Sequence, residues 1–136
     1  MPDLDRFVDA QRDTYDDALA ELTAGRKRSH WMWFIFPQIR GLGSSPTARH
    51  YAIADADEAR AYLGHAVLGP RLLKCCDAVL QHKDSSATAI FGTPDDLKLR
   101  SSVTLFQAVA PEEGRFNDVL VAFFDGKPDP LTLARL

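Results

Sequence analysis

Residues 29–38 read SHWMWFIFPQ, and this run limits the possible folds more than any other part of the chain. Its six consecutive large apolar residues, 31–36, are too few to cross a bilayer and too apolar to be exposed to water. A helix in this run would point large apolar side chains in every direction. The run therefore predicts a central element that the rest of the protein surrounds, with polar groups left at its two ends.

Composition indicates one ordinary globular domain over residues 1–136. The chain is 46% hydrophobic and 26% charged, which is enough apolar material to build a core. Its net charge of -3 gives no general attraction for nucleic acid, and the basic triplet at residues 26–28 is short. Nucleic acid is therefore not an expected partner.

The location that we expect is the cytoplasm. No apolar stretch is long enough for a transmembrane helix, and the acidic start of the chain does not resemble a secretion signal, so a membrane partner is not expected. Cys75 and Cys76 are adjacent and cannot join distant segments. Reduced thiols fit a cytoplasmic protein.

Apolar residues recur at helical spacing through most of the chain, and no alternating strand pattern bounded by hairpin turns occurs. We expect a loop over residues 40–47, and the pattern over 51–54 is ambiguous. The predicted helices cover residues 4–24, part of the central run, a segment from Asp55 or Asp57 to Gly64, and residues 70–82, 87–91, 93–109 and 116–124, with a short turn after Asp129. Pro37 either ends or kinks the helix in the central run. The predicted fold class is all-α, a single compact multi-helix domain around a buried aromatic central helix.

Several polar or aromatic residues near the central run are candidate site residues. His30 could act as a general base or could only cap the run, and Gln38 could orient a reacting group. Trp31 and Trp33 could stack a flat ligand or fill the core, and both apply if one ring lines a pocket. Gln11 lies on a buried helical stripe and needs a partner from the protein or from a ligand.

Two other segments could hold an anion. Arg40 precedes the sequence GLGSS, whose backbone amides and hydroxyls, including that of Ser44, can surround a phosphate or carboxylate. Lys98 and Ser101 share one side of the predicted helix 93–109, and Arg100 adds a second cation. If this helix meets the loop, they form an anion-binding pocket; otherwise the loop is only a tight turn and the helix side only a solvated face.

The remaining titratable residues indicate no metal or cofactor. The histidines and cysteines lack the spacing of metal ligands, and the glycines fit neither a phosphate-binding loop nor a dinucleotide-binding motif. Asp95 and Asp96 look like a catalytic pair, but carboxylates are also favoured in the first turn of a helix.

Several segments of the chain recur in one bacterial family: AQ at 10–11, RKRSHWMWFIFPQ at 26–38, GLGS at 41–44, EA at 58–59, LG at 68–69, FG at 91–92 and KLRSS at 98–102. On these segments the chain resembles the bacterial family DUF1810. The resemblance extends over nearly the whole chain and is most specific around the two tryptophans. The resemblance implies a small, cytoplasmic, mainly helical domain with no established activity. Some members carry the label calpastatin, but that kind of inhibitor is disordered and poor in aromatic residues, unlike this chain.

Together these features favour a site for a small anionic or nucleotide-like ligand, between the central run and the helix after Thr93. Hydrolysis or group transfer without a metal is compatible with the residues. The alternative is a protein-interaction or regulatory module without catalysis. We also expect Trp33 to lie in the core.

Overall fold

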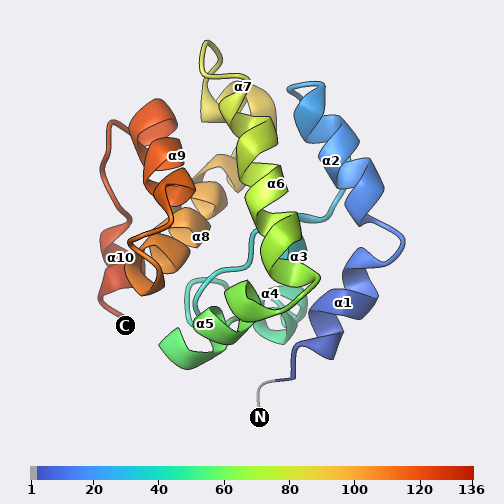
Figure 1. The fold of residues 1–136 in the computed structure, drawn as a ribbon, viewed down its shortest axis with the longest axis vertical. Helices are drawn as coiled ribbons and strands as arrows, with labels where there is room; N and C mark the ends of the chain where they lie inside the picture. Colours follow the sequence, from blue (N-terminus) through green and yellow to red (C-terminus); the bar gives the residue numbers. More distant parts are fainter. Residues whose placement is uncertain (1–2) are drawn as a thin grey trace.

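The computed structural model describes residues 3–136, so residues 1 and 2 of the predicted domain lie outside it. Over this range the chain forms helices and no strand, and the predicted all-α class is confirmed (Figure 1). The helices are α1 (Asp5–Gln11), α2 (Tyr15–Thr23), α3 (Met32–Ile35), α4 (Pro46–His50), α5 (Ala56–Gly64), α6 (Leu68–Leu80), α7 (Ala87–Phe91), α8 (Asp95–Val109), α9 (Gly114–Phe124) and α10 (Pro130–Leu133).

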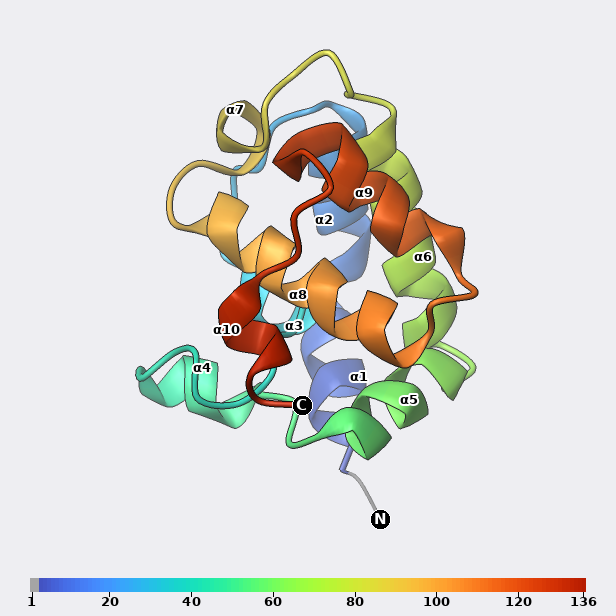
Figure 2. The same cartoon turned by 90° about the vertical axis from the view of Figure 1, so that its left-hand side faces the viewer.

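Helix α8 is the longest helix and packs against α5, α7, α9 and α10 (Figure 2). Its residues 101–106 are all buried, which is why a weakly patterned sequence still forms a stable helix here. Helix α6 packs against α2, α5 and α9, and α1 packs against α3. The helices thus form one shared core.

The aromatic run lies in that core, as predicted. Trp31 and Phe36 are completely buried, and Met32, Phe34 and Ile35 are nearly so. Only the four residues of α3 are helical, however, because the backbone leaves the helical region at Phe36. A residue before proline avoids the helical region, so Pro37 ends the helix rather than kinking it. The central element is therefore one helical turn followed by extended chain.

The predicted helix over residues 4–24 is wrong in one respect: it is two helices. Helix α1 ends at Gln11, three turn residues follow, and α2 begins at Tyr15. Two of the three turn residues are Asp13 and Thr14, which have low helix propensity. The regular apolar spacing continues across the break, so the pattern alone did not reveal it.

The predicted loop over residues 40–47 ends earlier than expected. Helix α4 begins at Pro46, and the Ser45 hydroxyl caps it by accepting a hydrogen bond from the Ala48 amide at 3.1 Å. Serine followed by proline is a helix-start signal that the loop assignment overlooked.

None of the helices in the described range is long and apolar enough to cross a membrane.

Candidate functional site

A pocket of about 820 Å³ lies between the segment 38–45, α4, and the facing sides of α8 and α10. In Figure 2, α10 lies next to α8, and α4 lies below them with the loop that leads into it. The structure thus brings the Arg40 loop and helix α8 together. The predicted site residues that line the pocket are Trp33, Gln38, Arg40, Ser44, Lys98, Arg100 and Ser101.

A single parallel bridge between Ile39 and Ile53 orients the start of the loop. The Ile53 amide donates to the Gln38 carbonyl at 2.8 Å, and the Arg40 amide donates to the Ile53 carbonyl at 2.8 Å. Both isoleucines are buried. Because side chains alternate along extended backbone, burial of Ile39 turns Gln38 and Arg40 toward the pocket. Gly41 follows with φ +92°, a conformation that favours glycine, and lets the chain turn.

The cations of the pocket differ in how far the protein neutralises them. No described residue forms an ion pair with Arg40 or with Arg49, which lies in the last turn of α4. The Lys98 ammonium lies 3.5 Å from the Asp95 carboxylate and 5.1 Å from the centre of the Trp33 ring. Arg100 donates to the carbonyls of residues 127 and 128, at 2.9 Å each. Arg40 and Arg49 therefore retain the most capacity for an anion.

Asp129 fixes the wall that α8 and α10 form. Its carboxylate accepts from the hydroxyls of Ser101 and Thr132, both at 2.7 Å. Burial alone would raise the pKa of Asp129, but these hydrogen bonds, with the Leu131 amide and nearby Arg100, outweigh it and lower the pKa. Ser101 is therefore engaged in holding α10 in place, as Arg100 is in holding residues 127 and 128.

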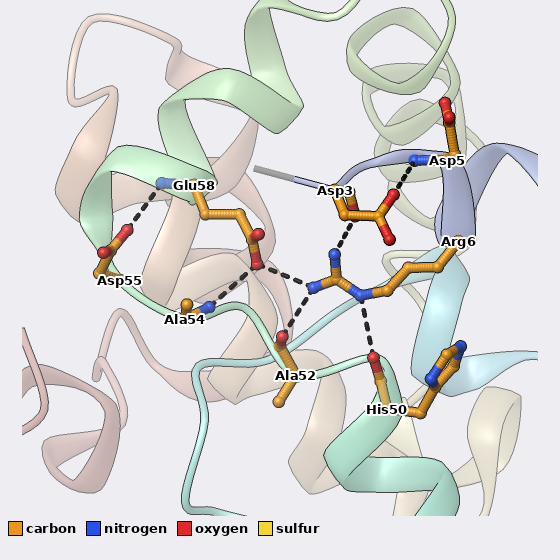
Figure 3. A network of polar contacts seen from close by, with 8 residues as sticks. All are labelled: Asp3, Asp5, Arg6, His50, Ala52, Ala54, Asp55 and Glu58. Carbon is orange, nitrogen blue, oxygen red and sulfur yellow. Dashed lines mark hydrogen bonds and ion pairs between the residues drawn. The ribbon is translucent and has the colours of Figure 1, made fainter. Parts of the chain in front are cut away.

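Arg6 fixes the opposite wall (Figure 3). Its guanidinium donates to the carbonyls of His50 and Ala52 at 2.9 Å each, and pairs with Glu58 at 2.8 Å. Glu58 in turn accepts from the Ala54 amide at 3.0 Å. This network joins α1, the end of α4 and α5, and so positions Arg49 and the pocket-lining residue Ala52. Sequence reasoning missed Arg6 because nothing in the local pattern indicates contacts with residues about fifty positions away.

Three predicted site residues lie away from the pocket. His30 is exposed at the opposite end of the aromatic run. Trp31 is buried, and its indole N–H donates to Glu21 at 3.0 Å. Gln11 is buried, donating to the Phe34 carbonyl at 2.7 Å and to the Tyr62 hydroxyl at 3.0 Å. Protein groups therefore satisfy Gln11 and Trp31, and the length of the run separates His30 from Gln38.

Trp33 was expected in the core, and this is only partly correct: it packs against the core but is only partly buried, and it lines the pocket. Sequence reasoning also missed several pocket-lining residues, including Arg49, Leu97, Asp129 and Leu131. The Asp129-Pro130 pair indicated a helix start, but no local signal indicated that α10 would form a wall of the pocket.

Chemically, the pocket offers cations, hydroxyls, backbone amides and the aromatic rings of Trp33 and Tyr51. Among the described residues that line it, Asp129 is the sole carboxylate and no histidine occurs. Over residues 3–136, no three histidine, cysteine or acidic side chains gather closely enough to hold a metal ion. The arrangement is suited to binding an anion, and it contains no free side chain with the ordinary properties of a general base.

The sequence matches the family described as protein of unknown function (DUF1810) over residues 1–136. A crystal structure of the conserved hypothetical protein Rv1873 from Mycobacterium tuberculosis is similar in fold and sequence. It has a TM-score of 0.97 and 51% identity, over 98% of this chain and 96% of the other. Among curated proteins, the chain has no significant match. The chain belongs to the DUF1810 family.

Proposed function

We propose that this protein binds a small anionic ligand in the pocket between the Arg40 loop, α4 and α8. One observation carries the proposal: Arg40, Arg49 and Lys98 line a single pocket, and of these three cations only Lys98 forms an ion pair with a described acidic residue. Like charges that share a cavity repel each other, and a bound anion relieves this repulsion.

The residues suggest how the anion is held. Arginine presents paired N–H donors that match phosphate and carboxylate oxygens, so Arg40 and Arg49 act as the main anchors. The Ser44 hydroxyl and the backbone amides of the glycine loop add neutral donors. Trp33 supplies a ring against which a base or another flat group can stack, which is why a nucleotide-like ligand belongs in the test.

Catalysis has weaker support than binding. Of the two predicted catalytic residues, Gln38 lines the pocket and His30 does not. A hydrolase or transferase would need Gln38 to orient water or the transferred group, with the ligand itself supplying the base. We therefore assign binding and leave the reaction out of the proposal.

Cellular location is part of the same proposal. Cys75 and Cys76 are buried in α6 as free thiols, and free thiols are typical of reducing compartments. These thiols and the bacterial source of the similar structure support a role in a bacterial cytoplasm.

A thermal-shift screen tests the binding proposal. The panel contains nucleotides, sugar phosphates and small carboxylates, each at low and high salt. A specific pocket raises the melting temperature with one ligand class and keeps the rise at high salt. Arg40→Ala and Arg49→Ala should each abolish the rise, whereas Arg28→Ala, which removes an exposed cation at the far end of the run, should not. A rise that persists in both pocket variants, or no rise with any ligand, would overturn the proposal.

A further inference from the structure

Two exposed leucines line the cationic pocket. Leu97 of α8 is 56% exposed and Leu131 of α10 is 66% exposed. A single exposed leucine is ordinary, but two from different helices at one pocket form an apolar surface beside the cations.

Hydrogen bonds hold these two leucines in place. The Ser101 hydroxyl lies 3.2 Å from the Leu97 carbonyl and donates to Asp129 at 2.7 Å. The Asp129 carboxylate also accepts from the Leu131 amide at 3.2 Å. The buried Ser101–Asp129 hydrogen bond therefore joins α8, which carries Leu97, to the start of α10, which carries Leu131, and the apolar surface is a fixed feature of the pocket wall.

We propose that the ligand is an amphipathic anion, with an alkyl or aryl group that packs between Leu97 and Leu131. This inference rests on the proposed function, because the anionic group still binds Arg40 and Arg49. The two ends of the ligand then meet opposite walls: the charge faces the loop and α4, and the apolar group faces α8 and α10. A volume of about 820 Å³ lies within the usual range for ligand pockets and accommodates both parts.

The apolar wall makes affinity depend on the length of the ligand. Each methylene that moves from water into an apolar site contributes up to about 0.8 kcal/mol, which corresponds to about fourfold in affinity. For a monomeric series of ethyl, butyl and hexyl phosphate, we expect affinity to rise about two- to fourfold per methylene, as measured by titration calorimetry below micelle concentrations.

Variants of the two pocket leucines, with a matched control, test whether the wall formed by α8 and α10 causes the dependence of affinity on chain length. Leu97→Ser and Leu131→Ser should flatten the dependence on chain length and leave ethyl phosphate binding unchanged. Leu133→Ser should retain the dependence on chain length. Leu133 lies on the same helix as Leu131 and is 45% exposed, but it does not line the pocket. Thermal unfolding of each variant checks that the fold is intact.

Different failures overturn different claims. Equal affinity for all three phosphates, or an unchanged length dependence in both pocket leucine variants, would overturn the amphipathic ligand while anion binding stands. Binding to vesicles of phosphatidylcholine and phosphatidic acid, without binding to hexyl phosphate, would also overturn it, because a membrane would then supply the apolar group. Undiminished binding of hexyl phosphate to Arg40→Ala would instead overturn the proposed function.

Discussion

The two ends of the aromatic run carry similar residues and use them differently. At the start of the run, the partly buried Glu21 carboxylate accepts hydrogen bonds from the amides of Arg28 and Ser29, the Ser29 hydroxyl and the Trp31 indole. At the other end, no described residue pairs with Arg40, and Ser44 is exposed. Each end has a tryptophan and cations, so residue types alone do not distinguish structural groups from groups available to a ligand.

The two ends differ in how closely acidic residues of the chain pair with the cations there. The Lys27 ammonium, next to Trp31, pairs with Asp95 at 2.9 Å and lies 5.0 Å from the centre of the Trp31 ring. Lys98, next to Trp33, shares the same Asp95 at the longer distance of 3.5 Å. A cation that the chain itself neutralises is part of the fold, whereas an unpaired cation that lines a pocket, as Arg40 does, is open to an external anion.

The largest effect that separates the two ends is the loss of a tryptophan. Trp31 is 0% exposed, so Trp31→Ala should leave a cavity and lower the free energy of unfolding by about 3–5 kcal/mol. Trp33→Ala only widens an open pocket and should cost about 1–2 kcal/mol. Denaturant unfolding of both variants measures the difference. Equal losses would mean that the two ends are equally structural.

The next effect is the loss of the Glu21 carboxylate. Glu21→Gln removes the negative charge that strengthens these four hydrogen bonds and turns the oxygen beside the Ser29 hydroxyl into a donor. The substitution should lower the free energy of unfolding by about 2 kcal/mol. Glu112→Gln is a suitable control because Glu112 is exposed. If the two variants are equally stable, Glu21 does not hold the start of the run.

Acid titration measures the same carboxylate in a different way. Burial alone would raise the pKa of Glu21, but the hydrogen bonds from Ser29, Arg28 and Trp31 outweigh it and lower the pKa from 4.5 to about 2. The folded protein thus binds this proton less readily than the unfolded chain. Glu21 therefore stabilises the fold fully above about pH 4.5, and this contribution is lost as the pH falls toward 2. Stability measured against pH should fall less steeply in Glu21→Gln than in the wild type, and parallel curves would contradict the assignment.

The smallest effect on stability belongs to the pocket end. Arg40 is exposed and has no described ion-pair partner, so Arg40→Ala should change the free energy of unfolding by less than about 0.5 kcal/mol. Chemical denaturation measures this directly. A loss of several kcal/mol would show that Arg40 is a structural residue and would remove the contrast between the two ends.

Local sequence patterns predicted much of this fold. The large apolar residues of the run 31–36 predicted that this segment lies in the core. Thr93-Pro94-Asp95 predicted the start of α8 to within two residues. The same patterns missed the break between α1 and α2, because apolar spacing continues through it. Turn residues, rather than periodicity, carry that information.

The site was predicted in part, for a physical reason. Arg40 and Lys98 could be proposed as partners because each lies in a segment with unusual local features. The partners of Trp31 and Arg6 could not be proposed, because Glu21 and Glu58 look like ordinary helix carboxylates until the helices pack. The roles of Trp31 and Trp33 depend on those tertiary contacts, so the sequence does not separate them.

The chain contains two tryptophans, and their indole N–H signals report on the two ends of the run separately. A titration with phenyl phosphate, followed by ¹⁵N–¹H correlation spectra, therefore tests the central claim most directly. We expect the Trp33 indole and the amides of residues 40–45 to shift in a saturable way, while the Trp31 indole, hydrogen-bonded to Glu21, stays in place. A shift at Trp31 with none at Trp33, or saturable binding that moves neither, would contradict an anion site at the pocket end.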